Sequence, residues 1–171
     1  MTDELISIRP AETDDINTIG FLAQQIWPIA YDGIVPPDQL RYMLNLFYSP
    51  AALRRQMIDE RHQFLLVEQG EEAIGFASWG VMKDPGIFKL HKLYVLPGQQ
   101  GKGLGRSMLQ FIFGVIGPEG AQVLRLNVNR FNKARQFYEK LGFRVIGEED
   151  VAIGNDYFMI DYIMEAPVTP V

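Results

Sequence analysis

Residues 90–109, LHKLYVLPGQQGKGLGRSML, join a strand-like run to a glycine-rich turn and the beginning of a helix. The run is apolar and β-favouring at Leu90, Leu93, Tyr94 and Val95, and Pro97 and Gly98 end it. Glycines then alternate at 101, 103 and 105, before an apolar pattern of helical spacing. A strand that enters a helix through such a turn directs several backbone N–H groups and the positive end of the helix dipole at one point. The stretch therefore predicts an anion site, most often a phosphate site.

The type of phosphate site follows from the spacing of the glycines. A Walker A loop requires Ser or Thr after its lysine, whereas Lys102 is followed by Gly103. A dinucleotide fingerprint beginning at Gly101 would need a glycine where Arg106 stands. The remaining pattern is Gln100-x-x-Gly103-x-Gly105, directly after an apolar strand. A glycine-rich turn that binds nothing is the alternative.

This pattern resembles the acyl-CoA pyrophosphate loop, Q/R-x-x-G-x-G/A, of the GNAT superfamily of N-acetyltransferases. Residues 124–143, LRLNVNRFNKARQFYEKLGF, resemble a second GNAT signature, which is a strand, an asparagine, an alanine-containing helix, a tyrosine and Gly-Phe. The two motifs occur in the family's order, and the resemblance extends from Ile6 to Met164. The segment from Trp27 through the next helix somewhat resembles bacterial polyamine or diamine acetyltransferases.

Periodicity and turn residues predict the elements of one α/β domain over residues 1–171. Helices are expected from Thr13 to a stop or kink at Trp27-Pro28, from Pro36, from Ser49, over 104–116 and over 132–141. Residues 27–35 are expected to form a loop. Strands are expected at 6–9, 64–68, 74–81, 90–96, 123–128, 143–147 and 157–164. The resemblance implies a mixed, mostly antiparallel sheet of six to seven strands with helices on both faces, in which a splayed parallel strand pair holds acyl-CoA.

The resemblance also implies the groups that contact acetyl-CoA, the co-substrate. The pantetheine arm would bond to the main chain of the strand, and the pyrophosphate to the turn. These positions are Leu93, Tyr94, Val95, Gln100, Gly101, Lys102, Gly103, Leu104, Gly105 and Arg106. Val95 N–H would stabilise the oxyanion. The family asparagine usually precedes the tyrosine by seven residues, but Asn132 precedes Tyr138 by six, so Asn129 is an alternative to Asn132.

Two residues are candidates for acid–base catalysis. The resemblance implies that Tyr138 gives a proton or hydrogen bond to the departing thiolate, while its helical spacing with Phe137 and Leu141 also fits a core aromatic residue. His91 stands where related enzymes carry a glutamate base, and a pKa near ~6.5 suits a base at neutral pH. A strand histidine packed on the helices or exposed to solvent is the other interpretation. The resemblance implies that Trp27 and Tyr31 line the acceptor pocket, with packing as the alternative. It also implies that the last strand borders this pocket, so Asp161 is a candidate to hold an ammonium group, with an edge-facing charge as the alternative.

Composition narrows the class of partner. The chain of 171 residues has no cysteine, which excludes disulfides and thiolate metal sites, and its two histidines are far apart, so no metal is expected. The net charge of −5 argues against nucleic acid. A cytoplasmic protein is expected, because no signal peptide or membrane-spanning run is apparent. The leading hypothesis is acetylation of a small-molecule amine. Acetylation of a protein N-terminus or lysine and a non-catalytic CoA-binding module are the alternatives. The sequence leaves the oligomeric state open, a homodimer included.

Overall fold

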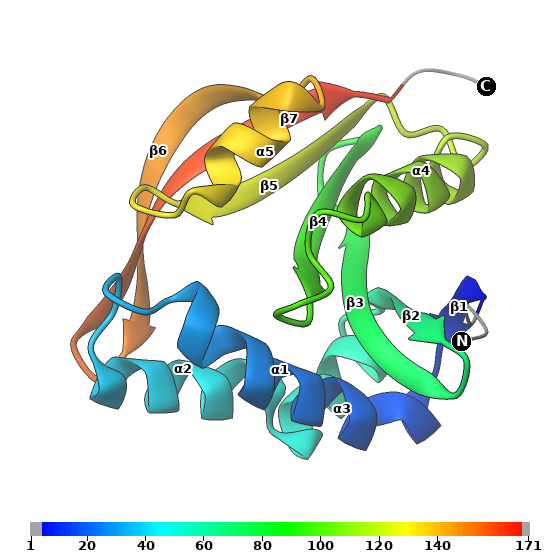
Figure 1. Cartoon of the computed structure of the whole chain (residues 1–171). Coiled ribbons are helices and arrows are strands. Elements are labelled where there is room, and N and C mark those ends of the chain that lie inside the picture. Colours follow the sequence, from blue (N-terminus) through cyan, green and yellow to red (C-terminus); the bar gives the residue numbers. More distant parts are fainter. Residues whose placement is uncertain (1–4, 169–171) are drawn as a thin grey trace.

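The computed structural model describes residues 5–168, in which seven strands form one sheet of order β1-β2-β3-β4-β5-β7-β6 (Figure 1). Only β4 and β5 pair in parallel. The strands are β1 (Ile6–Ala11), β2 (Gln63–Gln69), β3 (Glu72–Val81), β4 (Ile87–Val95), β5 (Val123–Asn129), β6 (Arg144–Gly154) and β7 (Tyr157–Pro167). The prediction of a mixed, mostly antiparallel sheet of six to seven strands is confirmed. Residues 1–4 and 169–171 of the predicted domain lie outside the described residues.

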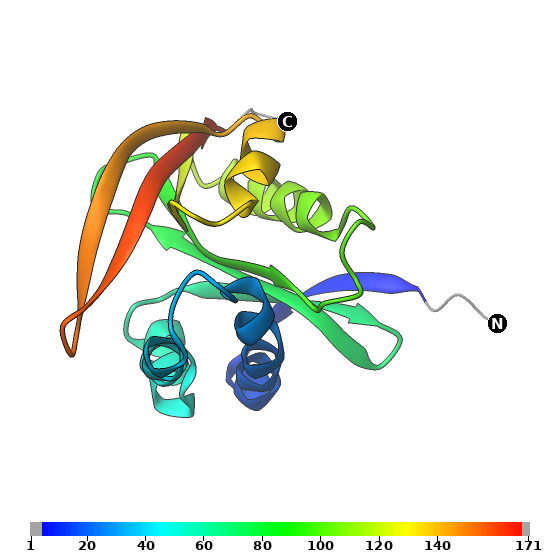
Figure 2. The ribbon, with the colours of Figure 1, turned by 60° about the vertical axis from the view of Figure 1, so that its left-hand side comes forward.

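Helices cover both faces of the sheet (Figure 2). One face carries the 3-10 turn η1 (Thr13–Asp15) followed by α1 (Ile16–Ala30), α2 (Pro37–Tyr48) and α3 (Pro50–Ile58), and the other carries α4 (Leu104–Ile116) and α5 (Ala134–Lys140). Each layer buries its own apolar core: Phe64, Leu66 and Phe76 face α1–α3, whereas Leu65, Ile74 and Ala77 face α4. This alternation follows from the two-residue period of a strand, and a β-bulge at Ile74, opposite Val67 and Glu68, places Ile74 on the same face as Ala77. No helix in residues 5–168 is long and apolar enough to span a membrane.

Local sequence explains most helix boundaries, with one correction. Pro50 begins α3 while the side chain of Ser49 accepts a hydrogen bond from Ala52 N. Of the stop or kink expected at Trp27-Pro28, the stop is wrong, because α1 continues through Pro28 to Ala30, and the loop expected over residues 27–35 begins only at Tyr31. Near the end of a helix, a proline removes one hydrogen bond without interrupting a long ladder, so two more residues fit.

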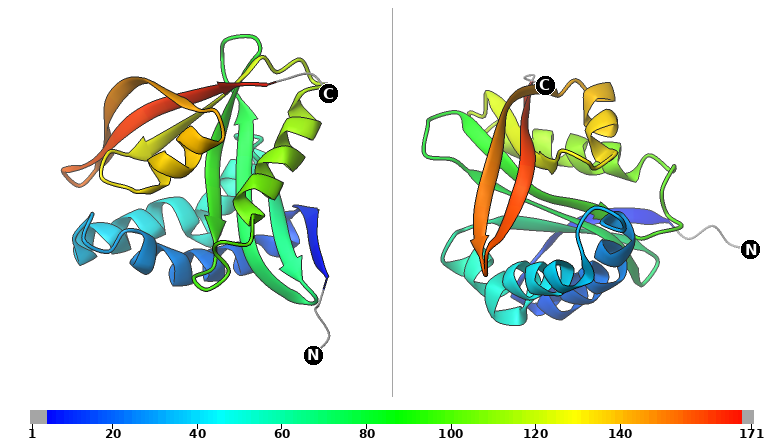
Figure 3. Two further views of the ribbon diagram at one scale, coloured as in Figure 1. Left: turned by 45° about the horizontal axis from the view of Figure 1, so that its top comes forward. Right: turned by 90° about the vertical axis from the view of Figure 1, so that its left-hand side faces the viewer.

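The last hairpin is longer than predicted. The strand expected over residues 143–147 extends as β6 from Arg144 to Gly154, although Glu148, Glu149 and Asp150 have low β propensity. Their charges are tolerated because β6 is the edge strand of the sheet. The far end of the hairpin reaches α2 (Figure 3), where Tyr42 Oη donates to Ile153 O at 2.5 Å. The hairpin and the α1–α3 layer therefore enclose one side of the molecule.

Candidate active site

The parallel pair β4–β5 separates part-way along its length. Pairing runs from Ile87–Val123 to Leu90–Leu126 and stops there. Beyond that point β4 stays paired with β3 as far as Val95, and β5 stays paired with β7 as far as Asn129. The two edges that face each other consequently carry backbone donors and acceptors that pair with neither strand. Buried backbone groups require partners, so this gap suits an extended ligand that contains amide groups.

A cavity occupies this gap and is lined by residues from four elements and their loops. Among the lining residues are Tyr31, His91, Tyr94, Asn129, Asn132 and Tyr138. The structure therefore brings together the two predicted catalytic residues, both candidate asparagines and one of the two predicted acceptor residues. The lining comes from both sides of the sheet, since Tyr31 follows α1 and Tyr138 lies on α5.

The glycine-rich turn joins the end of β4 to the beginning of α4. Gly98, Gly101 and Gly103 have positive φ angles of 89°, 82° and 75°, a region that other L-residues rarely adopt. Gly103 caps α4, and no side chain hydrogen-bonds the first turn there. The first backbone N–H groups of the helix therefore remain available to an anion, and Lys102 and Arg106 are exposed beside them. The turn therefore suits an anion such as a pyrophosphate.

Tyr138 lies on α5 with its ring held between two phenylalanines. The ring centroids of Phe137 and Phe143 lie 5.2 and 5.5 Å away, both edge-on. Burial raises the pKa of Tyr138 well above its usual value, so the phenol is fully protonated at neutral pH. The ring of Tyr138 belongs to the core, and the residue also lines the cavity. The geometry is therefore compatible with a core aromatic residue and with an acid in the site.

Asn129 and Asn132, the two candidates for the asparagine of the GNAT signature, both stabilise the loop before α5. Asn129 Oδ1 accepts from Phe131 N, and Asn132 Oδ1 accepts from Ala134 N, each at 2.9 Å. Both bonds are local turns that asparagine favours. Because both residues also line the cavity, the geometry keeps both as candidates for contact with CoA.

His91 faces the α1–α3 layer and stacks on His62, with ring centroids 3.8 Å apart. The pKa of His91 is lowered to about 2, mainly by burial and in part by the neighbouring His62, Lys92 and Lys89. Burial also lowers the pKa of His62. His91 is therefore a neutral imidazole across the physiological range, able to accept a hydrogen bond but a weak base towards an ammonium ion.

The predicted acceptor residues occupy different depths. Tyr31 lines the cavity, and its hydroxyl lies 3.2 Å from the hydroxyl of Tyr94. Trp27 lies behind Tyr31, with ring centroids 4.7 Å apart, and packs against Tyr48 and Phe47 as well. Only Tyr31 of this pair is in a position to touch a molecule in the gap.

A carboxylate on the last strand, Asp161, lies on β7 beside the gap and is buried, so the interpretation of it as an exposed edge charge is wrong. Asp161 is 2% exposed and accepts a hydrogen bond from Asn127 Nδ2 at 3.2 Å, and the same amide donates to Glu149. Burial raises the pKa of Asp161, and within residues 5–168 its side chain has no cationic nitrogen within 4 Å. Asn127 lines the cavity, so this carboxylate is adjacent to the space that a substrate would enter.

Comparison with known proteins identifies the family. The family model described as an acetyltransferase (GNAT) domain matches residues 34–162. The chain belongs to the GNAT family. This acetyltransferase is 26% identical to the spermidine N(1)-acetyltransferase of Thermoplasma acidophilum over 90% of the chain and 95% of that relative. A crystal structure of PaiA N-acetyltransferase from T. acidophilum in complex with coenzyme A has a TM-score of 0.81 at 26% identity, covering 95% of this chain and 99% of the other.

A third relative acetylates a protein. It is the ribosomal protein bS18 alanine N-acetyltransferase of Haemophilus influenzae, 33% identical over 51% of this chain and 58% of that relative. All these relatives carry acetyltransferase names, and this chain is an acetyl-CoA-dependent N-acetyltransferase. Residues 5–168 contain no group of three His, Cys, Asp or Glu side chains arranged to hold a metal ion.

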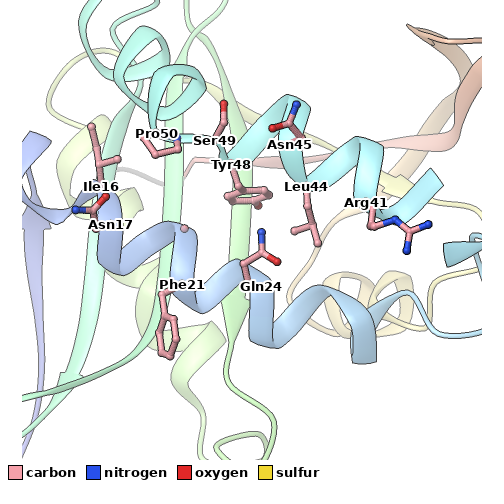
Figure 4. A pocket seen from close by; sticks show the side chains of 11 residues that line it. Ile16, Asn17, Phe21, Gln24, Arg41, Leu44, Asn45, Tyr48, Ser49 and Pro50 are labelled. Atoms are coloured by element: carbon pink, nitrogen blue, oxygen red, sulfur yellow. The ribbon is translucent and has the colours of Figure 1, made fainter. Parts of the chain in front are cut away.

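A second concavity lies between α1 and the junction of α2 with α3 (Figure 4). Phe21 and Gln24 line it from α1, and Arg41 and Asn45 line it from α2. None of the predicted catalytic or CoA-binding residues lines this concavity. We therefore assign the chemistry to the gap between β4 and β5.

Replacing Gly103 by alanine tests the turn. A residue other than glycine at a φ of 75° costs about 1–2 kcal/mol, and relaxing that strain moves the N–H groups at the start of α4. We expect Gly103→Ala to weaken CoA binding by about 5- to 30-fold in isothermal titration calorimetry. Gly120→Ala is the matched control, because Gly120 also has positive φ and an open Cβ position but follows α4 at its other end. Equal CoA affinities in the two variants would contradict the assignment.

The neutral state of His91 makes stability depend on pH. The folded-state pKa lies below the unfolded value of ~6.5, so the unfolded chain binds more protons below that value and stability falls on acidification. Between pH 7 and 5 the wild type should lose up to about 2 kcal/mol more unfolding free energy than His91→Phe, which keeps a ring for stacking. Urea unfolding at both pH values measures this difference. Equal losses in the two proteins would show that His91 titrates normally in the folded state.

Proposed function

We propose that this enzyme transfers the acetyl group of acetyl-CoA to a primary amine of a small molecule, with a diamine or polyamine as the acceptor class. The observation that carries the proposal is the cavity in the β4–β5 gap, which places Tyr138 and His91 in one lining. The glycine-rich turn supports binding of the pyrophosphate, and the unpaired strand edges support binding of the pantetheine arm. The similarity to a spermidine acetyltransferase supports the acceptor class.

The proposed reaction is a direct transfer. The neutral amine attacks the thioester carbonyl, and the backbone N–H of Val95 stabilises the oxyanion. The C–S bond then breaks as the C–N bond is completed, and Tyr138 gives its proton to the departing thiolate. The nitrogen loses its proton to the solvent through water that hydrogen-bonds the neutral imidazole of His91, and Tyr138 is reprotonated from the solvent. Because a phenol gives up its proton reluctantly in a buried site, hydrogen bonding to the sulfur precedes and accompanies the transfer.

The enclosed acceptor side favours a small molecule over a protein. Gln39 Nε2 donates to Phe158 O at 3.2 Å, and the rings of Tyr42 and Tyr157 lie 5.3 Å apart, so two contacts besides the Tyr42–Ile153 bond join the hairpin to α2. An extended polypeptide would need a groove along the face that the hairpin covers. A protein N-terminus is the alternative acceptor, because the Haemophilus relative is named as a ribosomal protein alanine N-acetyltransferase. Including a peptide in a panel of amine substrates tests this alternative.

Removing the hydroxyl of Tyr138 should lower kcat with little change in KM for acetyl-CoA. Loss of a positioned acid typically costs about 10²- to 10⁴-fold, and Tyr138→Phe keeps the edge-on ring contacts. Release of free CoA thiol under steady-state conditions provides the rates. Tyr157→Phe, a change of the same chemistry at the far end of the hairpin, is the control. A Tyr138→Phe enzyme with full kcat would exclude the proposed acid.

Neutralising Asp161 tests recognition of a charged acceptor. A buried carboxylate without a cationic partner provides a favourable position for an ammonium group, and its loss should raise KM for a diamine by about 10-fold, or ~1.4 kcal/mol. Asp161→Asn should leave KM for acetyl-CoA unchanged. Glu148→Gln removes a largely exposed carboxylate from β6 and should change neither constant. An unaltered KM for the diamine in Asp161→Asn would show that Asp161 takes no part in binding the acceptor.

A further inference from the structure

Lys92 is a buried cation that the proposed chemistry does not use. It lies on β4, is 8% exposed, and within residues 5–168 has no carboxylate within 4 Å. Burial lowers the pKa of Lys92 to about 8, partly offset by Glu60. Removing an ammonium group from water without a counter-ion costs several kcal/mol, so such a residue requires a structural or functional reason.

The contacts of Lys92 join β4 to the two helices beneath it. Lys92 Nζ donates to Gln56 Oε1 of α3 at 2.8 Å, and Gln56 Nε2 donates to Phe47 O of α2 at 3.0 Å. The ammonium group also lies 5.2 Å from the ring centre of Tyr48 and 5.7 Å from that of Phe64. Cation–π contacts of this kind partly replace the lost hydration. The chain from Lys92 through Gln56 to Phe47 therefore connects one strand residue to two helices.

Lys92 follows a β-bulge that coincides with the separation of β4 from β5. In the ladder with β3, Ser78 pairs with Lys92 and Trp79 pairs with Leu90, so His91 is the extra residue. Successive side chains of a regular strand alternate between faces, but the bulge directs both His91 and Lys92 towards the α1–α3 side. Leu90, just before the bulge, is also the last residue of β4 that pairs with β5.

The room for this arrangement comes from a glycine on the neighbouring strand. A Cβ atom added to Gly80 would lie 3.3 Å from His62 Cδ2 and 3.5 Å from His91 Nε2, close to the stacked rings. The backbone N–H of His62 donates to Gln56 O at 2.8 Å, so the same residue that binds Lys92 also positions the ring on which His91 stacks. Gln56 thus binds the side chain of Lys92 through its amide oxygen and the backbone of His62 through its carbonyl oxygen.

We propose that Lys92 is a positioning residue whose bond to Gln56 fixes the bulge in β4 and thereby the gap that receives the pantetheine arm of acetyl-CoA. The inference rests on the proposed binding of that arm between β4 and β5. Without the tether, the segment after Leu90 is free to approach β5, where unpaired backbone groups on both strands favour pairing. The turn at 98–103 binds the pyrophosphate separately, because its conformation depends on its own glycines.

Two ligands that differ only in the arm test this inference. The probes are acetyl-CoA and 3′-phosphoadenosine 5′-diphosphate, which contains the nucleotide and pyrophosphate but no pantetheine, and calorimetry gives both dissociation constants. Lys92→Met keeps the length of the side chain and removes the ammonium group. We expect it to weaken acetyl-CoA binding about 10-fold and binding of the nucleotide less than about 2-fold. Lys83→Met, which removes an exposed lysine from the turn before β4, should leave both constants unchanged.

Variants of Gln56, the hydrogen-bond partner of Lys92, test the inference independently. They also provide the test if Lys92→Met fails to fold. Gln56→Met removes the acceptor and should have the same selective effect on acetyl-CoA. Gln56→Glu retains an acceptor for Lys92 but loses the bond to Phe47 O, so its affinity for acetyl-CoA should lie between those of the wild type and Gln56→Met. If Gln56→Met weakens both probes equally, or neither, the tether does not control the gap and the inference is overturned. Failure of the wild type to bind acetyl-CoA would instead contradict the proposed binding mode itself.

Discussion

The separation of two parallel strands is the constraint on which the rest of this structure depends. Paired strands satisfy each other's backbone groups, so a sheet that opens in its middle exposes donors and acceptors inside the protein. Here β4 and β5 part after Leu90 and Leu126, while each keeps its other neighbour. Pantetheine contains two amide groups in an extended chain, and it can occupy the opening as an added strand would. In the proposed binding mode, the arm satisfies the backbone groups that the opening leaves unpaired.

The opening also lets one active site use both faces of the sheet. On the α4–α5 face, the glycine turn and the first N–H groups of α4 form the proposed site for the negatively charged end of the coenzyme. On the α1–α3 face, Tyr31 and the hairpin of β6 and β7 bound the space for the acceptor. The reacting carbonyl must therefore lie at sheet level, where main-chain groups of β4 have fixed directions. Rigid strands position such groups more accurately than loops do.

The sequence predicts those parts of the site that depend on local backbone geometry. Gly101 and Gly103 stand out because positive φ angles require glycine, and the helix after them has a clear apolar period. The bulge at His91 could not be predicted, because it depends on pairing with β3 and leaves an ordinary strand composition. Lys92 gave no signal for the same reason, and Asp161 was a candidate only through the family resemblance. A charged residue on a strand normally faces water, and tertiary packing alone decides that these two are buried. The length of β6 was missed because an edge position overrides low β propensity.

Two buried charges of opposite sign flank the opening, and their placement bears on the reaction. Lys92 belongs to β4, and Asp161 belongs to β7, which pairs with β5 on the far side of the gap. A cationic acceptor is attracted towards the Asp161 side and repelled from the Lys92 side. Because electrostatic interactions are strong in a poorly hydrated gap, an arrangement that is costly for folding orients a cationic acceptor towards the Asp161 side.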